Sequence, residues 1–225
     1  MNKKICVYAI CKNEEKFVDR FVDSMSEADK IIVLDTGSTD NSVKKLKDRG
    51  VVVFSEIINP WRFDRARNIA LELIPDYYDI CVCVDLDEVF NKGWREEIEK
   101  VWRDDTKKLS YRYTWSFLEN GEEGVVFWIE KIHTRHDFRW KHPVHEVLEY
   151  SGKDPLMITK AENIQLNHYP DSTKSRNQYL PLLEMSVKEE PDDDRNMHYL
   201  GREYMFNGMW EKCIETLKIH LSLPK

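Results

Sequence analysis

The chain has 225 residues, of which 41 % are hydrophobic and 33 % charged, a balance that suits a folded domain with a core and not a disordered chain. Its net charge of −7 argues against a general nucleic-acid binder, which would carry a basic face. We see no apolar run long enough to span a bilayer and no signal peptide after Met1, so we expect a cytoplasmic protein without a transmembrane segment.

The first half of the sequence alternates between strand and helix patterns. Continuous apolar runs predict strands at residues 4–10, 30–34, 51–55 and 79–84. Helical spacing predicts helices at 17–26, from the Ser/Thr/Asp cluster before residue 42 to Gly50, and at 63–74 before Pro75. This alternation predicts an α/β fold with a mostly parallel central sheet, whose ligand crevice lies beyond the carboxyl ends of its strands.

The second half changes character twice. Two β-rich runs, 111–115 and 125–129, flank a turn that contains Asn120-Gly121 and predict an antiparallel edge on the sheet. Helical patterns follow at 172–188, 196–206 and 209–221, which predict a small all-α tail. We therefore expect a catalytic domain at residues 1–170 and a helical tail at 171–225.

Five cysteines agree with a reducing location. They are an odd number and lie scattered through core-like segments, at Cys6, Cys11, Cys81, Cys83 and Cys213. Such a distribution favours buried, reduced thiols over a disulfide framework, and no second Cys/His pair gives zinc spacing to Cys81 and Cys83.

Acidic residues follow two of the expected strands. Asp85 and Asp87 come directly after the strand at 79–84, and Asp35 follows the strand at 30–34. Two carboxylates at one strand end suit Mg²⁺ or Mn²⁺, which prefer oxygen ligands and leave positions open for a diphosphate. The alternatives are a solvated acidic turn after the fourth strand and helix capping by Ser38, Thr39 or Asp40 after the second, although capping by those residues leaves Asp35 unexplained.

The order of four motifs resembles the family 2 glycosyltransferases, which have the GT-A nucleotide-sugar fold. The motifs are Ile10-Cys11-Lys12-Asn13-Glu14-Glu15, Asp35-Thr36-Gly37-Ser38-Thr39-Asp40, Ala66-Arg67-Asn68-Ile69-Ala70 and Asp85-Leu86-Asp87. The resemblance implies transfer of a sugar from a nucleotide-sugar donor, with UDP the commonest nucleotide, by metal-dependent and inverting displacement. The acceptor stays open among a saccharide, a lipid-linked sugar and a protein.

The resemblance also implies roles for particular residues. The donor would contact Ala9, Cys11, Asn13, Glu14, Asp35, Arg67, Asn68, Asp85 and Leu86. Mn²⁺ or Mg²⁺ would be held by Asp87, with Asp85 and His168 as further ligands. For the acceptor proton we nominate Glu146 as the general base and Asp137 as its substitute. The residue before Glu146 is a histidine where many members have an acid, which leaves this assignment open.

Aromatic and helical features add weaker hypotheses. Trp115, Trp128 and Trp140 are candidates to stack on an acceptor sugar or to fill a core. The tail spacing Leu200-Gly201-x-x-Tyr204, Gly208-x-Trp210, Cys213, Leu217 and Pro224 resembles a single tetratricopeptide repeat, which cannot bury its own faces. The tail is therefore a candidate surface for a homodimer or a protein partner.

Two other functions compete with the transferase. A nucleotidyltransferase would carry a glycine-rich basic loop after the first strand, whereas the loop here, residues 11–15, has no glycine and ends in Glu14 and Glu15. No phosphate-binding glycine motif occurs in the sequence. The second alternative is a catalytically weak or inactive nucleotide-sugar-binding domain that acts as an interaction module through its tail. The presence of both Asp85 and Asp87 disfavours lost chemistry.

Overall fold

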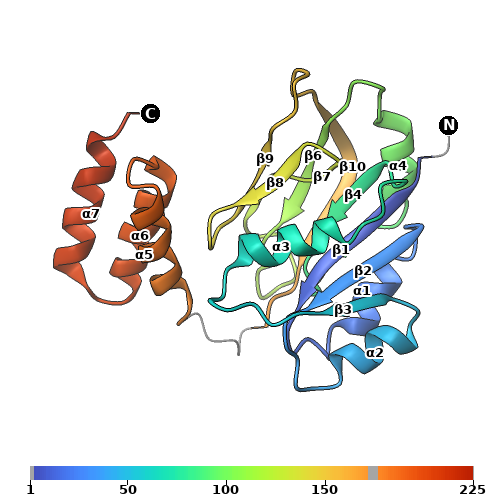
Figure 1. The fold of residues 1–225 in the computed structure, drawn as a ribbon, viewed down its shortest axis with the longest axis horizontal. Helices are drawn as coiled ribbons and strands as arrows, with labels where there is room; N and C mark the ends of the chain where they lie inside the picture. Colours follow the sequence, from blue (N-terminus) through green and yellow to red (C-terminus); the bar gives the residue numbers. More distant parts are fainter. Residues whose placement is uncertain (1–2, 172–176, 225) are drawn as a thin grey trace. The chain divides into compact units, whose positions relative to one another are not determined.

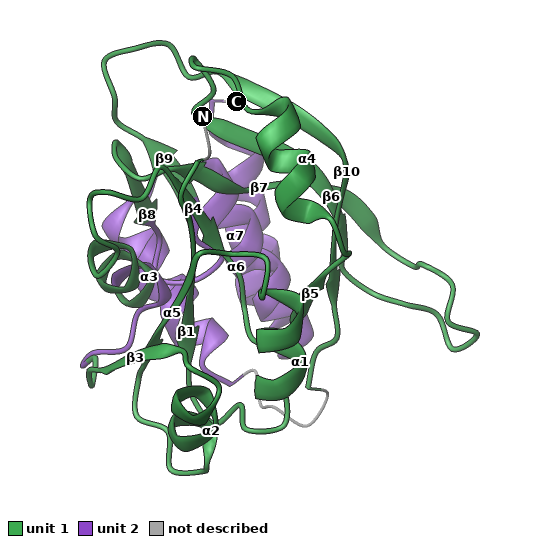
Figure 2. Cartoon of the chain, turned by 90° about the vertical axis from the view of Figure 1, so that its right-hand side faces the viewer, with its two compact units in different colours: residues 1–58, 66–140, 148–171 green, residues 59–65, 141–147, 172–225 purple. Residues whose placement is uncertain are grey.

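The computed structural model describes residues 3–171 and 177–224, and its chain divides into two compact units (Figure 2). Unit 1 comprises Met1–Ile58, Ala66–Trp140 and Leu148–Asp171, and unit 2 comprises Asn59–Arg65, Lys141–Val147 and Ser172–Lys225. Unit 2 thus takes two segments from before residue 170 in addition to the tail. We describe each unit by itself.

Unit 1 is the α/β part that the sequence predicts. Its strands in chain order are β1 (Ile5–Cys11), β2 (Lys30–Asp35), β3 (Val52–Ser55), β4 (Ile80–Cys83), β5 (Glu88–Phe90), β6 (Lys108–Thr114), β7 (Val126–Thr134), β8 (Phe138–Lys141), β9 (Val147–Tyr150) and β10 (Ile158–His168). Its helices are α1 (Val18–Ser24), α2 (Ser42–Asp48), most of α3 (Phe63–Glu72) and α4 (Trp94–Val101). The loop between β8 and β9 belongs to unit 2.

Eight strands form one sheet in the order β3-β2-β1-β4-β7-β6-β10-β5, and β8 pairs with β9 in a small second sheet (Figure 1). The strands β3, β2, β1 and β4 are mutually parallel, so their carboxyl ends meet at one edge. β7 runs antiparallel between β4 and β6. The β-rich runs after residue 108 therefore continue the parallel half of the sheet on the side of β4.

Burial is most complete in β1 and β4, the two parallel strands in the middle of the sheet. Every residue of β4 is buried, and β1 is buried except for Ile10. Such continuous apolar strands are stable only when helices cover both faces, and α3 covers one face while α1 and α4 cover the other (Figure 2). Trp94 of α4 is fully buried, stacks on Phe90 and donates from its indole N–H to the Ser24 carbonyl, 3.1 Å away.

Unit 2 contains three tail helices, α5 (Tyr179–Glu189), α6 (Asp194–Phe206) and α7 (Trp210–Ser222). Their core includes Leu183, Leu200 and Cys213, and Val144 of the β8–β9 loop packs into the same cluster. α5 begins at Tyr179, directly after a turn at Asn177 and Gln178. The first residues of the helix predicted at 172–188, residues 172–176, lie outside the described residues.

Two expectations about composition can be compared with the structure. All five cysteines are buried and free, which confirms the prediction of reduced thiols without disulfides. Among residues 3–171 and 177–224, we find no helix with the length and apolarity needed to cross a membrane.

Candidate functional site

The acidic residues at the strand ends share one edge of the sheet. Asp85 and Asp87 lie in the turn between β4 and β5, and Asp35 is the last residue of β2. β1 lies between β2 and β4 and runs parallel to both, so the backbones of β2 and β4 are about 10 Å apart, two strand spacings. The three carboxylates therefore lie at the carboxyl edge of the parallel strands.

Asp85 is held by two cations, the buried Arg67 and the partly buried Lys131. Arg67 of α3 donates from one terminal nitrogen to both carboxylate oxygens of Asp85, at 2.9 and 3.2 Å, and Lys131 Nζ of β7 lies 3.8 Å from Asp85 Oδ2. Burial alone would raise the pKa of Asp85, but the positive charges of Arg67 and Lys131 lower it to about 2. Asp85 is therefore an anion whose charge is already balanced by the protein.

Lys131 and Glu88 are site residues that the sequence did not reveal. Lys131 Nζ donates to both carboxylate oxygens of Glu88, at 2.8 and 3.1 Å, and Glu88 is 1 % exposed. Glu88 Oε2 also accepts a hydrogen bond from the backbone N–H of Asp85, 2.8 Å away. The pair fixes the turn that presents Asp85 and Asp87. Burial alone would lower the pKa of Lys131, but the negative charges of Glu88 and Asp85 outweigh burial and raise it.

Asp87 lies beside His168, the last residue of β10. His168 Nε2 is 3.4 Å from Asp87 Oδ2, and Nδ1 is 3.0 Å from the carbonyl oxygen of Trp115. Burial lowers the pKa of His168, but its hydrogen bond with Asp87 and the charge of that carboxylate outweigh burial and raise the pKa above its ordinary value. A nitrogen and a carboxylate oxygen at this spacing fit two ligands of one divalent ion.

The three ligands expected from the sequence are not assembled as a set. Among the described residues, Asp85, Asp87 and His168 do not place three ligand atoms within 4.8 Å of one another. Asp85 is instead paired with Arg67 and Lys131, so Asp87 and His168 are the two residues best placed to hold a cation.

The loop after β1 interlocks with the turn after β2. Asn13, which has a positive φ of 57°, accepts at Oδ1 from the Thr39 N–H at 2.7 Å, and its own N–H donates to Ser38 Oγ at 2.9 Å. The Glu14 N–H donates to Ser42 Oγ at 2.7 Å. Asn13 and Glu14 thus join the two loops that border the edge of the sheet.

Asp35 itself closes the turn that follows it. Its carboxylate accepts from the N–H groups of Gly37 and Ser38, at 3.2 and 3.1 Å, and the residue is 4 % exposed. Asp35 therefore caps its own turn, a local role that capping by Ser38, Thr39 or Asp40 does not cover. Gly37 has a φ of 104°, and a Cβ there would lie 2.7 Å from Ile57 Cδ1, so this turn requires glycine.

Three residues expected to contact the donor have side chains buried in the core. Ala9, Cys11 and Leu86 are between 0 and 2 % exposed. Burial raises the pKa of the Cys11 thiol to about 12, so it is a neutral, inert group. Any contact of these residues with a ligand would use their backbone atoms.

Asn68 and Trp140 are joined by a pair of hydrogen bonds. The Asn68 amide donates to the Trp140 carbonyl and accepts from the Trp140 N–H, both at 2.8 Å. Trp140 is 4 % exposed, lies under the Arg67 guanidinium, and donates from its indole to Tyr8 Oη at 2.9 Å. Trp140 is therefore too buried to stack on an acceptor, whereas Trp115 and Trp128 remain about half exposed.

The two candidate bases lie in different units. Asp137 belongs to unit 1 and follows β7, which ends opposite Ile80 at the start of β4, so Asp137 lies at the edge of the sheet away from Asp85 and Asp87. This position disfavours Asp137 as a base at the crevice. Glu146 belongs to the 141–147 loop of unit 2.

The 141–147 loop is anchored to the helices of unit 2. Val144 is 2 % exposed in the helical core, and the carbonyl of Pro143 accepts from the Phe63 N–H at 2.9 Å. His145 stacks on Tyr199 with ring centroids 4.2 Å apart, and its carbonyl accepts from Arg195 at 2.6 Å. The backbone of the three residues before Glu146 is therefore fixed by contacts within unit 2.

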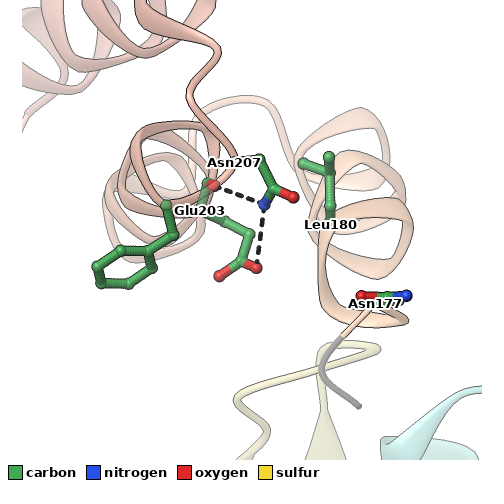
Figure 3. Close-up of a pocket in the computed structure, with 5 residues that line it drawn as sticks. Asn177, Leu180, Glu203 and Asn207 are labelled. Carbon is green, nitrogen blue, oxygen red and sulfur yellow. Dashed lines mark hydrogen bonds between the residues drawn. The ribbon is translucent and has the colours of Figure 1, made fainter.

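Unit 2 also has a hollow of about 300 Å³ beside α5 and α6 (Figure 3). It is lined by Asn177, Leu180, Glu203, Phe206 and Asn207. Asn207 donates from Nδ2 to the carbonyl of Glu203 at 2.9 Å and lies 3.4 Å from its Oε1. These contacts are local to one helix end, and none of the predicted site residues lines the hollow.

Comparison with known proteins gives a family match. The sequence model of the family described as "Glycosyl transferase family 2" matches residues 6–152. A curated relative, the lipopolysaccharide core biosynthesis glycosyltransferase LpsC of Rhizobium meliloti, is 29 % identical over 101 residues, which are 43 % of this chain and 36 % of LpsC. The chain therefore spans little more than a third of that relative.

Solved structures with the same fold include TarS of S. aureus. A structure of TarS residues 1–349 in complex with UDP-GlcNAc aligns with a TM-score of 0.56 at 14 % identity, over 98 % of this chain and 82 % of that one. A longer TarS structure aligns with a TM-score of 0.53 at 15 % identity, over 90 % of this chain and 44 % of that one. These likenesses establish the GT-A type of fold for the sheet and its helices.

Proposed function

The chain belongs to glycosyl transferase family 2, and from this membership we propose that it transfers a sugar from a nucleoside-diphosphate sugar to an acceptor hydroxyl or thiol. The observation that carries the proposal is the edge of the sheet where Asp85 and Asp87 follow β4 beside Arg67 and Lys131. The two carboxylates suit a bound cation, and the two positively charged side chains suit the phosphates of a donor.

The donor side of the proposal rests on the two interlocked loops. The turn after β2, closed by Asp35, and the loop that contains Asn13 border the same edge as Asp85. A nucleoside in this position would meet backbone groups of residues 9–14 and the polar atoms of the turn. UDP-sugars are the first donors to test, because they are common in the family and UDP-GlcNAc is the ligand named for TarS.

The residues present fit a divalent cation. Asp87 and His168 offer an oxygen and a nitrogen, and Asp87 keeps enough exposure for other ligands to approach. When bound, Mn²⁺ or Mg²⁺ would offset negative charge on the diphosphate of the donor. Arg67 and Lys131 supply fixed positive charge next to that position, and both are held by ion pairs that limit their movement.

The transfer itself would be a single displacement with inversion. The bond between the anomeric carbon and the diphosphate oxygen breaks, the acceptor atom forms the new bond, and Glu146 takes the acceptor proton. Positioning of the two substrates can contribute about 7–11 kcal/mol to lowering the barrier. The helical tail is a candidate surface for a protein acceptor, a second copy or another partner.

Release of UDP from UDP-sugars in the presence of Mn²⁺ tests this proposal. Asp87→Ala should abolish metal-dependent donor binding and UDP release. Asp48→Ala serves as the matched control, because Asp48 is an exposed acid at the end of α2. A wild-type protein that neither binds nor hydrolyses any nucleotide sugar, with either metal, would contradict the proposal.

A further inference from the structure

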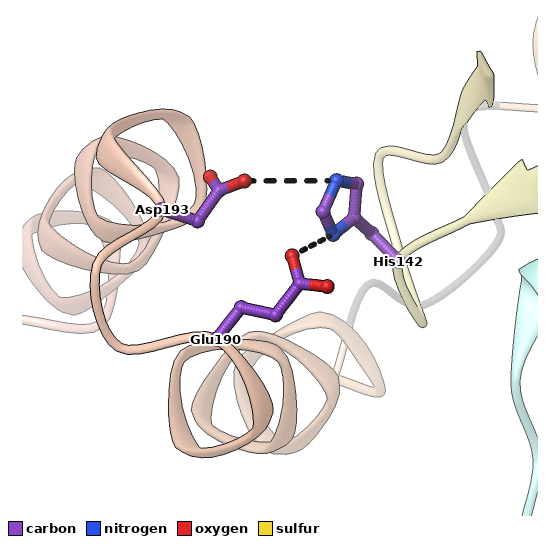
Figure 4. Close-up of side chains that lie close together, drawn as sticks. All are labelled: His142, Glu190 and Asp193. Carbon is purple, nitrogen blue, oxygen red and sulfur yellow. Dashed lines mark ion pairs between the residues drawn. The ribbon is translucent and has the colours of Figure 1, made fainter. Parts of the chain in front are cut away.

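A second group of metal-ligand side chains lies in unit 2, outside the donor site (Figure 4). His142 comes from the 141–147 loop, Glu190 follows α5, and Asp193 precedes α6. His142 Nδ1 lies 3.7 Å from Glu190 Oε2, and His142 Nε2 lies 3.8 Å from Asp193 Oδ2. One ligand atom from each residue lies within 4.8 Å of the others.

A buried amide next to this group has an unused oxygen. Asn196 is fully buried, its Nδ2 lies 2.9 Å from His142 Nδ1, and its Oδ1 accepts no hydrogen bond from the described residues. Histidines that bind a metal through Nε2 carry their proton on Nδ1 and donate it to an oxygen. If the Asn196 amide turns by 180°, Oδ1 takes the place of Nδ2 beside His142 Nδ1. Oδ1 can then accept the hydrogen bond from a protonated Nδ1.

We propose that His142, Glu190 and Asp193 bind a divalent transition-metal ion, for which Zn²⁺ is the best match, and that this ion fixes the 141–147 loop to α5 and α6. One imidazole and two carboxylates are ligands that zinc accepts, with water in the fourth position. Mg²⁺ fits poorly, since it prefers six oxygen ligands in an octahedron.

A zinc ion bound at His142 Nε2 needs two adjustments, the first of which is a turn of the Glu190 carboxylate, which now faces Nδ1, toward Nε2. Ligand atoms around a tetrahedral zinc at 2.0–2.1 Å are about 3.3 Å apart, so the distance from His142 Nε2 to Asp193 Oδ2 must shorten by about 0.5 Å. The side chain of Glu190 is 41 % exposed and that of Asp193 is 24 % exposed, which lets the carboxylates adjust and lets water complete the shell. His142 is 8 % exposed and provides the fixed ligand.

The site would order the loop that also contains Glu146, because His142 lies four positions before that residue. This metal site is separate from the proposed donor cation site, because its ligands lie in unit 2 whereas Asp87 and His168 lie in unit 1. Its test must exclude the proposed donor cation, so it uses the full chain with the Asp87→Asn substitution, free of any affinity tag and stripped with a chelator.

Titration calorimetry with Zn²⁺ alone measures the site in that background. We expect one Zn²⁺ per chain, and His142→Gln should weaken its binding by about 100-fold or more. Asp193→Asn should weaken it too while keeping the start of α6, because asparagine also caps helices and Asp193 Oδ1 accepts from the Asn196 N–H at 2.6 Å. Asp192→Asn, an exposed neighbour, should change nothing.

Two further measurements make the result decisive if His142→Gln unfolds. X-ray absorption at the zinc edge should show one imidazole among oxygen ligands, and hydrogen exchange of residues 141–147 should slow when zinc is added. Zinc that binds equally well to the Asp193→Asn protein, or that does not bind the Asp87→Asn protein, would overturn the proposal. In that case His142 is only an ion-pair partner of Glu190 and Asp193.

Discussion

Arg67 reaches from α3 across the end of β4 and binds Asp85 with one nitrogen 2.9 Å from Oδ1 and 3.2 Å from Oδ2. The Arg67 side chain is 8 % exposed and that of Asp85 is 36 % exposed, so the cation is buried while the anion borders solvent. The pair therefore fixes a carboxylate at the candidate donor site and keeps it charged.

Removal of this arginine should affect stability and donor binding together. Arg67→Met should lower the free energy of unfolding by about 1–2 kcal/mol, less than the loss of a fully buried pair, because Asp85 is partly exposed. Urea denaturation measures this change, and calorimetry with UDP and Mn²⁺ should show weaker binding. Arg65→Met, at an exposed position of the same helix, should leave both quantities unchanged.

The strand ends of the site were predictable, whereas the partners of Asp85 were not. A buried apolar run followed by Asp85 and Asp87 is a local pattern, and the alternation of strands and helices places it at the carboxyl edge. Lys131 reaches Asp85 because β7 inserts antiparallel beside β4, a pairing of distant segments that no local pattern records. Glu88 follows the motif directly in sequence, but its hydrogen bond to the Asp85 N–H depends on the three-dimensional shape of the turn.

The division of the chain between its units was also hidden from local patterns. The loop 141–147 lies between two strands of unit 1 in sequence, yet Val144 packs with the helices of unit 2. His142 and His145 adopt positive φ angles of 75° and 52°, which are uncommon for any residue except glycine and which no local pattern predicted here. Long-range packing decided both features.

Glu146 can be tested as the base by separating turnover from donor affinity. Glu146→Gln keeps the shape of the side chain but cannot take a proton, so turnover should fall by about 10²–10⁴-fold. Donor affinity should stay near that of the wild type. Once an acceptor is known, steady-state kinetics and calorimetry measure the two quantities.

Asp137→Asn is the matched control for this experiment, because Asp137 is an exposed acid at the other edge of the sheet. A large loss of turnover in Asp137→Asn with none in Glu146→Gln would reverse the assignment. A large loss of donor binding in Glu146→Gln would point to a structural role for Glu146.

A buried histidine gives unit 1 a defined response to acid. His133 is fully buried, accepts from the Tyr8 hydroxyl at Nε2 (2.9 Å) and lies 2.7 Å from the Thr134 carbonyl at Nδ1. Burial lowers the pKa of His133 to about 3. Below its ordinary pKa of about 6.5, the unfolded chain takes up a proton that the folded chain refuses, so the free energy of unfolding should fall by up to about 1.4 kcal/mol per pH unit.

Urea denaturation between about pH 7 and pH 5 measures this slope. His133→Phe keeps an aromatic ring against Tyr8 and Phe138, and it should lower stability at pH 7 but flatten the response to acid. His136→Gln removes an exposed histidine two residues past β7 and should leave the slope intact. An unchanged slope in His133→Phe would assign the acid response to other groups.

Helices α6 and α7 pack closely where Gly201 faces Leu217, and a side chain at position 201 would collide with Leu217. A Cβ at Gly201 would lie 2.5 Å from Leu217 Cδ2 and 2.7 Å from its Cγ. Gly201→Ala removes the poor helix propensity of glycine, worth about 1 kcal/mol, but forces Leu217 out of its place at a cost of about 1–3 kcal/mol. We expect a net loss of stability, measured by thermal or urea unfolding.

Gly201→Ala combined with Leu217→Ala should be less destabilising than the sum of the two single changes, because the second substitution opens the space that the first one fills. A double variant whose loss equals that sum would show that the two residues are not in contact.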